Sequence, residues 1–415
     1  MFHRWQMALN LTFEQQQILD ENTGRSFALE FVCTYAKAVG AAQLIPIASA
    51  HIDGCLYHGQ VSLDFVKHLI ELGAKVSVPT TLNVGSVDLI HPGLVRGDAL
   101  NTNGRELMQA HLALGCAPSF TCAPYQLAAS RPAFGSHIAW GESNAICFAN
   151  SVCGARTERY GDFIDLACAI AGFAPEYGLH INENRRAKWL LNIAPDNLDS
   201  AMVAIAAGHF IGRMGQDKIA AIDGLNASTN EGDLKGLGAA AASTGAVGMF
   251  HAIGLTPEAA TFETAFQGYE PEAILHLNEV GLRDELAMLS TVKQGTRLSA
   301  VSLGTPHFSL AEFARLMPLL KGFKAKIPFT INTNRAALDS LSKLGWDKTL
   351  QDFGVSLVVD TCVYVTTILD DLSGAVMTNS GKMAYYAPAN LGCEIAFGSL
   401  AECIASAQTG TVVRL

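Results

Sequence analysis

The chain has 415 residues, more than one typical core holds, so two or three domains are expected. Hydrophobic residues make up 49% of it and charged residues only 16%, which provides an ample interior and excludes a disordered chain. The formal net charge of -10, without clustered Lys and Arg, argues against nucleic acid and anionic membranes as partners.

The N-terminal sequence MFHRWQM is too short and too polar to be a secretory segment. The ten cysteines are therefore expected to be reduced thiols and not a disulfide framework. Both features predict a cytoplasmic protein.

Residues 1–198 are predicted to form a first α/β domain. Apolar residues at helical spacing behind Thr12, and short apolar runs further on, predict alternating helices and strands. The expected order is helix, strand, helix, strand, over residues 11–38, 43–47, 62–72 and 75–78.

Polar side chains follow both of these strands. Ligands of open α/β sheets bind where strands end, so these residues are candidates for a binding site. They are His51, Asp53, Thr80, Thr81 and Asn83. A His51–Asp53 pair that merely closes a turn is the competing interpretation.

Residues 117–159 are unusually rich in hydrogen-bonding side chains, and helices are expected on either side, over 105–114 and 163–170. Cys122 is followed two residues later by proline, which predicts an irregular turn. The polar residues behind it alternate with large apolar ones, a mixture typical of a cavity that holds a small polar ligand. The candidates are Glu142, Ser143, Asn144, Asn150, Ser151, Arg156 and Thr157. For any one of them, a helix cap at Ser143 or Ser151 beside a solvated loop is the alternative.

Residues 199–296 are rich in Ala and Gly and are predicted to form a smaller second domain, with helices near 202–210 and 257–266. The segment 236–241 matches a relaxed dinucleotide fingerprint, but no apolar strand precedes it. The uncharged segment 236–257 has too few large apolar residues for a membrane span, so a buried helix of small residues is expected.

Residues 297–415 alternate between short apolar runs and helical patterns, which predicts a parallel, doubly wound sheet. Strands are expected over 298–303, 327–331, 355–359, 374–377 and 394–397, with helices over 310–319, 335–344 and 400–407. Polar residues again follow the strands: His307, Cys362, Asn379, Ser380 and Lys382. A lysine at a helix N-terminus, such as Lys382, is well suited to hold a carboxylate or phosphate.

Cys122 and Cys362 both lie at predicted strand ends, and three chemistries are open to them. A cysteine nucleophile could use His307 or His51 as base, although no third orienting residue is evident. A zinc site would normally show a closely spaced Cys or His pair, which is missing. Isolated thiolates that converge from different domains occur in some iron–sulfur hydro-lyases. Buried free cysteines with no function remain the plain alternative.

Eight motifs, in order along nearly the whole chain, resemble the large catalytic part of the aconitase X family. They are SAHIDG (49–54), VPTTLN (78–83), FTCAPY (120–125), GESNA (141–145), NSVCGART (150–157), GLH (178–180), DTC (360–362) and TNSGK (378–382). The resemblance implies a dehydratase with an aconitase-like three-domain body and an iron or iron–sulfur centre, in which Cys122 and Cys362 match metal-ligand motifs. Members of the family dehydrate cis-3-hydroxy-L-proline or mevalonate 5-phosphate.

One motif departs from the family. Where we associate cluster-bearing members with Gly-Cys-Pro-His, this chain has Gly304-Thr305-Pro306-His307. A hydroxyl is a poor ligand for a soft iron–sulfur centre, so either Cys393 or Cys403 replaces the missing cysteine or the centre is smaller, down to a single iron. The change weakly favours the hydroxyproline-type subgroup.

The resemblance also implies a small swivelling domain with a catalytic serine, for which we find no room before residue 415, so a separate small subunit is expected. The expected reaction converts cis-3-hydroxy-L-proline to 1-pyrroline-2-carboxylate through an enamine, with the base on the partner. Arg156 or Lys382 would hold the carboxylate, and His51 with Asp53, or His307, would protonate the departing water. Ser151 completes the catalytic candidates, and Cys403 the metal candidates. A metal-free cysteine or serine enzyme and a non-catalytic metabolite-binding subunit are the alternatives from other classes.

Overall fold

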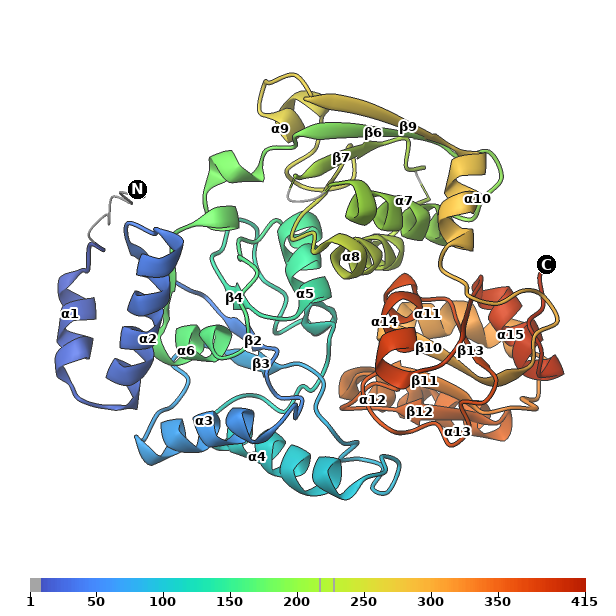
Figure 1. Cartoon of the computed structure of the whole chain (residues 1–415), viewed down its shortest axis with the longest axis horizontal. Coiled ribbons are helices and arrows are strands. Elements are labelled where there is room, and N and C mark those ends of the chain that lie inside the picture. Colours follow the sequence, from blue (N-terminus) through green and yellow to red (C-terminus); the bar gives the residue numbers. More distant parts are fainter. Residues whose placement is uncertain (1–8, 216–217, 227) are drawn as a thin grey trace.

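The computed structural model describes residues 9–215, 218–226 and 228–415. The N-terminal segment MFHRWQM lies outside these residues. The chain forms three α/β domains that meet around a common centre (Figure 1), each built on its own parallel sheet. The predicted α/β class and three-domain body are therefore confirmed.

The first domain contains a three-stranded parallel sheet of order β3-β2-β4 and a separate antiparallel pair, β1-β5. Its strands are β1 (Leu44–Pro46), β2 (Ala50–Ile52), β3 (Thr80–Leu82), β4 (Ala139–Trp140) and β5 (Phe173–Pro175). Its helices are α1 (Phe13–Asp20), α2 (Gly24–Val39), α3 (Gln60–Glu71), α4 (Arg105–Ala113), α5 (Ser143–Phe148) and α6 (Ile164–Ala171).

Two predictions for this domain were wrong in detail. The single helix expected over 11–38 is two helices, because Thr23 begins a second capping box after Thr12 has started the first. The strand expected over 75–78 is displaced to β3, where Thr80–Leu82 pair with Ala50–Ile52. Polar Thr80 and Thr81 therefore lie within the strand and not behind it.

The second domain has a parallel sheet of order β8-β7-β6-β9. Its strands are β6 (Trp189–Ala194), β7 (Ala220–Asp223), β8 (His251–Ala252) and β9 (Ala273–Asn278), and its helices are α7 (Ser200–Gly215), α8 (Glu231–Gly245), α9 (Phe262–Phe266) and α10 (Glu279–Ala287). The expected small-residue helix is α8, which ends at Gly245. It packs so closely on α7 that a Cβ at Gly245 would lie 1.9 Å from the Gly212 carbonyl oxygen. The helix expected over 257–266 is only α9, because Thr261 caps it at residue 262.

The third domain is a five-stranded parallel sheet of order β12-β11-β10-β13-β14, as its alternating pattern predicts. Its strands are β10 (Leu298–Phe308), β11 (Phe329–Thr333), β12 (Val355–Val358), β13 (Ala375–Thr378) and β14 (Ile395–Phe397). Its helices are α11 (Leu310–Leu316), α12 (Arg335–Leu344), α13 (Trp346–Asp352), α14 (Gly381–Leu391) and α15 (Leu400–Thr409). The strand order reverses at β10, so Thr305 and His307 at its carboxyl end lie at the topological switch point of the sheet.

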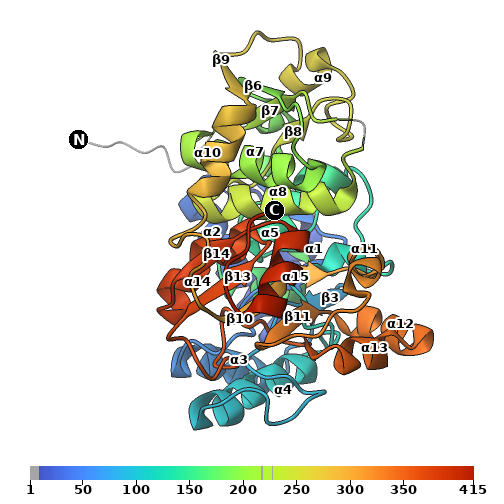
Figure 2. The ribbon, with the colours of Figure 1, turned by 90° about the vertical axis from the view of Figure 1, so that its right-hand side faces the viewer.

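One apolar cluster connects the three domains, and a second one lies within the third domain. The largest apolar cluster runs through the first two domains and into the third, where it includes Cys362 and Met383, while a separate cluster that includes Cys403 fills the third domain. Figure 2 shows the second domain stacked above the other two in the turned view. The domain limits at 198 and 296 stay a prediction; strand β6, which precedes the first limit, pairs with β7 and β9 of the second domain.

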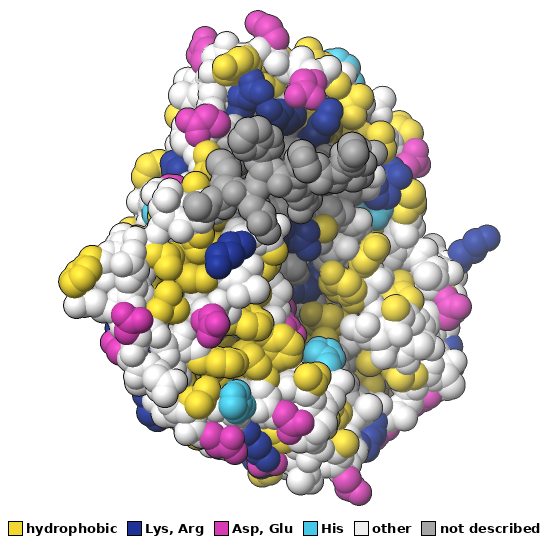
Figure 3. All heavy atoms as spheres, turned by 60° about the vertical axis from the view of Figure 1, so that its left-hand side comes forward, with side chains coloured by type: hydrophobic (Ala, Val, Ile, Leu, Met, Phe, Trp, Pro, Cys, Tyr) yellow, Lys and Arg dark blue, Asp and Glu magenta, His cyan; other side chains and the backbone are white. Residues whose placement is uncertain are grey.

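The surface carries charges of both signs. On the face shown in Figure 3, Lys and Arg side chains are interspersed with Asp and Glu, and a hollow opens near the middle. Among the described residues, we find no helix that is both long and apolar enough to span a bilayer.

Candidate metal centre

Three metal-ligating side chains from distant parts of the sequence meet in the interior. The ligand atoms of Cys122, His307 and Cys362 all lie within 4.8 Å of one another, and all three residues are buried. Cys122 lies beside the end of β3, where Thr121 N–H donates to the Leu82 carbonyl (2.9 Å). His307 lies in β10, and Cys362 follows β12. In the described part of the chain this is the one grouping of three such residues.

The imidazole of His307 is held on both sides. Its Nε2 lies 3.3 Å from the Thr361 carbonyl oxygen, which can only accept, so we assign the proton to Nε2. Its Nδ1 then accepts from the Thr121 hydroxyl at 3.0 Å. Burial lowers the pKa of His307 to about 3, so the ring is neutral at physiological pH. Its backbone N–H also donates to the Cys122 sulfur (3.3 Å).

The pKa values of the two thiols are shifted in opposite directions. Burial alone would raise the pKa of Cys122, but a hydrogen bond from the Cys362 thiol and the charge of Lys382 bring it below its ordinary value. Burial and the same interaction with Cys122 raise the pKa of Cys362 well above its ordinary value. Cys122 is therefore the thiol of the pair that ionises more readily, and a thiolate is the form that binds metal.

The donor set fits a metal ion that prefers soft ligands. The two sulfurs suit iron, an iron–sulfur centre or zinc, and do not suit magnesium or calcium; the imidazole would join them only by giving up the hydrogen bond between Nδ1 and Thr121. Thr305, two residues before His307, has a buried hydroxyl with no hydrogen-bond partner among the described residues. The predicted third ligand, Cys403, is not brought to this group, because α15 holds it in the separate core of the third domain, where its thiol lies 3.9 Å from the Gly398 carbonyl oxygen.

A buried ion pair borders the cysteines. Lys382, in the first turn of α14, binds Glu142, which caps α5 by accepting from Ala145 N–H (2.6 Å). Burial opposes the ammonium charge of Lys382, but Glu142, Tyr364 and Cys122 raise its pKa well above its ordinary value. A cation therefore lies close to Cys122 at the junction of the first and third domains.

Asp53 is a carboxyl of this region whose pKa lies near neutral pH. Burial, with the nearby charges of Glu142 and Asp162, raises its pKa to about 7. The Asn83 amide donates a hydrogen bond to it, and its own backbone N–H donates to Asp165 (2.7 Å). Asp53 can therefore carry or release a proton near neutral pH.

His51 does not pair with Asp53 in the way the sequence analysis expected. Its Nδ1 lies 2.8 Å from the Thr81 hydroxyl, and its ring packs on Trp140 with centroids 5.7 Å apart. Burial lowers its pKa to about 3. Because strand β2 directs His51 toward its neighbours in the sheet, we assign it no proton transfer.

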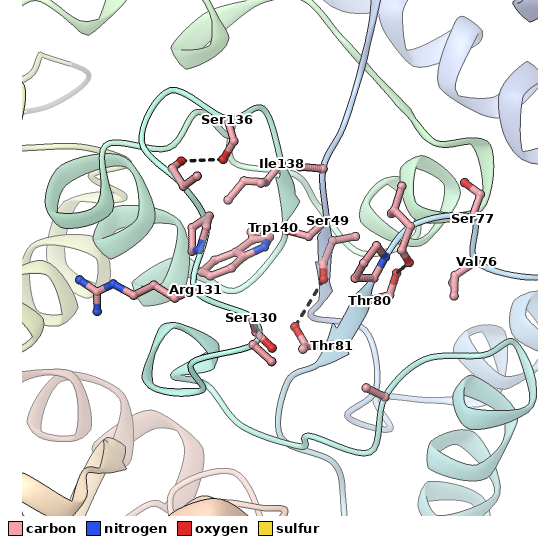
Figure 4. A pocket seen from close by; sticks show the side chains of 18 of the residues that line it. Ser49, Val76, Ser77, Thr80, Thr81, Ser130, Arg131, Ser136, Ile138 and Trp140 are labelled. Carbon is pink, nitrogen blue, oxygen red and sulfur yellow. Dashed lines mark hydrogen bonds between the residues drawn. The ribbon is translucent and has the colours of Figure 1, made fainter.

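Thr80 lines a different cavity, of about 620 Å³, at the beginnings of the three strands of the first sheet (Figure 4). Its hydroxyl donates to the Val78 carbonyl (2.8 Å). Ser49 and Trp140 line the same cavity. The shift of β3 along the chain is what moves Thr80 to this end of the sheet.

Three further candidates form structural hydrogen bonds and do not reach the cysteines. The Asn150 amide donates to the carbonyls of Thr157 (2.9 Å) and Gly248 (3.0 Å), and the Ser151 hydroxyl accepts from Phe250 N–H (2.9 Å). Arg156 donates to the His180 carbonyl (3.2 Å) and to the Asn182 side chain (3.1 Å). These three side chains therefore hold the loops between the first and second domains.

Three more candidates lie beside Glu142 or just before helix α14. The Ser143 hydroxyl lies 3.4 Å from Glu142, which takes the capping position expected for Ser143. Ser380 caps α14 and donates to the Thr305 carbonyl. Asn379, Ser380 and Thr305 line a cavity of about 410 Å³ between the second and third domains.

Lys235, which was not predicted from the sequence, supports His307. Its ammonium group donates to the His307 carbonyl (3.1 Å) and forms a buried ion pair with Glu312 (2.5 Å). Gln126 donates to the same carbonyl (2.9 Å). A single cation inside an Ala- and Gly-rich buried helix is the signal that could have identified Lys235.

Comparisons with known proteins agree with this architecture. The chain matches the first, second and third domains of aconitase X over residues 8–183, 187–286 and 298–409. It superposes on the crystal structure of Thermococcus kodakaraensis aconitase X in its holo-form with a TM-score of 0.86 and 30% identity, covering 96% of this chain and 100% of that one.

Curated relatives fall into two groups. A cis-3-hydroxy-L-proline dehydratase of Pseudomonas aeruginosa is 40% identical over 96% of this chain and 70% of its own length, and one of Hypocrea jecorina is 36% identical over 92% and 65%. The chain thus spans just under two thirds of the latter. A phosphomevalonate dehydratase large subunit of Methanosarcina mazei is 32% identical over 96% of this chain and 97% of its own length.

Proposed function

From the premise that this chain belongs to the aconitase X family of hydro-lyases, we propose that it is the large subunit of a cis-3-hydroxy-L-proline dehydratase. The product would be 1-pyrroline-2-carboxylate, reached through an enamine. The observation that carries the proposal is the buried group of Cys122, His307 and Cys362 beside the charged Lys382. The 40% identity to the P. aeruginosa dehydratase supports this substrate over mevalonate 5-phosphate.

Cys122 and Cys362 would hold iron or an iron–sulfur centre, with His307 beside them. When bound, such a centre supplies a Lewis acid for the departing hydroxyl. Cys362 holds its proton more strongly than Cys122 does, so metal binding must release a proton from Cys362. Burial keeps competing water away from the sulfurs.

Two side chains of this chain would act on the substrate itself. Lys382 would hold its carboxylate, with Glu142 keeping the ammonium group charged inside the protein. Asp53, oriented by Asn83, would give a proton to the departing water. Ser143, beside Glu142, and Asn379 and Ser380, which line the cavity between the second and third domains, would complete the binding site.

Asp53 predicts a defined pH dependence. An acid with a pKa of about 7 is protonated below that pH and ionised above it, so kcat/KM should fall as the pH rises through 7. Asp53→Asn keeps the hydrogen bond to Asn83 but cannot give up a proton, and should lower kcat by about 100- to 10,000-fold. A pH profile of both forms checks this. If kcat/KM of the variant still fell as the pH rose through 7, the pKa would belong to another group.

We also propose that the base that removes the α-proton resides on a small swivelling subunit. The large-subunit relatives, which match over almost their whole length, support a two-chain assembly. The chain should therefore convert substrate only when the small subunit is added.

The test mixes the chain with its small subunit and offers cis-3-hydroxy-L-proline or mevalonate 5-phosphate in separate assays. Formation of 1-pyrroline-2-carboxylate from the first, with little turnover of the second, is expected. The reverse preference would assign the chain to the phosphomevalonate group. Full activity after chelation and confirmed metal removal would instead support a metal-free cysteine or serine enzyme, and no turnover of either substrate would support a binding subunit.

A further inference from the structure

The two cysteine loops share a backbone feature that lies two residues before each cysteine. Phe120 precedes Cys122 with φ +39°, and Asp360 precedes Cys362 with φ +62°. Left-handed backbone is costly for residues other than glycine, and most of all for a bulky one such as phenylalanine. Each loop therefore needs outside contacts to keep this conformation.

One side chain contacts both of these residues. Arg335, the first residue of α12, donates from Nε and from a terminal nitrogen to the two carboxylate oxygens of Asp360, each at 2.7 Å. The guanidinium carbon of Arg335 also lies 5.3 Å from the centre of the Phe120 ring. The planar guanidinium group can make both contacts at once, and a lysine cannot.

The same loops are tied across the domain junction. Asp360 accepts at its side chain from Leu89 N–H (3.2 Å) and at its carbonyl from Gly85 N–H (2.7 Å), and both donors belong to the first domain. The Asp360 side chain is fully buried, so without Arg335 its charge would have only backbone partners.

We propose that Arg335 is a positioning residue that sets the spacing of Cys122 and Cys362 for metal binding. It fixes the Phe120 loop from one side and the Asp360 loop from the other, so both sulfurs face one point. The inference rests on the proposed metal-dependent function, because it assigns the cysteines as ligands.

The test titrates the metal-free full chain with Co²⁺ alone and records the thiolate charge-transfer absorption, which grows with the number of bound thiolates. Arg335→Met should bind Co²⁺ about 10- to 100-fold more weakly, as loss of a supporting partner typically does, with a weaker band per metal. Arg335→Lys should fall between this variant and the wild type, and it decides the question if the methionine variant does not fold.

Arg213→Met is the matched control. Arg213 forms a similar paired contact with Glu285 in the second domain, and its exposed fraction, 40%, is close to the 31% of Arg335. The control should bind Co²⁺ as the wild type does. Wild-type affinity and band intensity in folded Arg335 variants would overturn the proposal, as would a wild-type chain that binds no Co²⁺ through thiolates. A chain that binds Co²⁺ as expected but dehydrates neither substrate would refute the proposed function and leave the role of Arg335 standing.

Discussion

Cys122→Ser should remove both the bound iron and measurable dehydration in the assembled enzyme. The Cys122 sulfur accepts from His307 N–H (3.3 Å), and its pKa lies below the ordinary value, so a hydroxyl at this position removes the more acidic thiol of the pair. Hydroxyl oxygen is a poor ligand for iron that prefers sulfur. Because loss of supporting partners alone typically costs 10- to 100-fold in metal affinity or activity, loss of a ligand should cost at least about 100-fold.

Iron per chain, measured after purification, and turnover of cis-3-hydroxy-L-proline check this prediction together. Cys403→Ala is the control, because its thiol is equally buried but lies in the separate core of the third domain. The control should keep its iron and most of its activity. Iron loss in Cys403→Ala would show that this cysteine joins the centre, and full activity of iron-free Cys122→Ser would refute the metal-dependent scheme.

The third domain could be predicted almost entirely from sequence because its signals are local. Four of its five strands are each followed by a helix, and the parallel sheet follows from that alternation; β12 leads directly to β13, and helix α13 was not predicted. The errors lie where a local signal is ambiguous. Residues 11–38 carry one continuous apolar periodicity, and only the cap at Thr23 divides them.

The site could be predicted in part, because the rule that ligands bind at strand ends identifies segments but not side-chain directions. It located Cys122, Cys362 and His307, which meet in the structure. Asn150 and Arg156 were selected from the mixture of polar and apolar residues over 117–159, and their hydrogen bonds serve neighbouring loops. Stabilising contacts between residues that are far apart in the chain are harder still to predict from sequence.

Arg335 illustrates this last difficulty. In the sequence it is one arginine at the start of an ordinary amphipathic helix. Its contacts with Phe120 and Asp360 join positions that are far apart in the chain, and no local pattern encodes them.

Lys382→Met should inactivate the enzyme and also destabilise it by about 3–5 kcal/mol, the usual cost of leaving one partner of a buried ion pair alone. Both side chains of the Lys382–Glu142 pair are only 4% exposed, so water cannot solvate the carboxylate that remains. Loss of the ammonium group would also remove the proposed partner of the substrate carboxylate. Stability and activity therefore fall together in this variant, and a second substitution is needed to separate them.

The double variant Glu142→Gln with Lys382→Met makes that separation. Glutamine keeps an oxygen that can accept from Ala145 N–H and carries no charge, so much of the lost stability should return, as when a buried ion pair is replaced by uncharged groups. Activity should not return, because no cation remains to hold the substrate. Denaturant unfolding of the wild type, of Lys382→Met, of Glu142→Gln and of the double variant gives the coupling energy of the pair, and turnover is measured on the same samples. If the double variant regained activity along with stability, Lys382 would have a structural role alone and the substrate carboxylate would have to bind elsewhere.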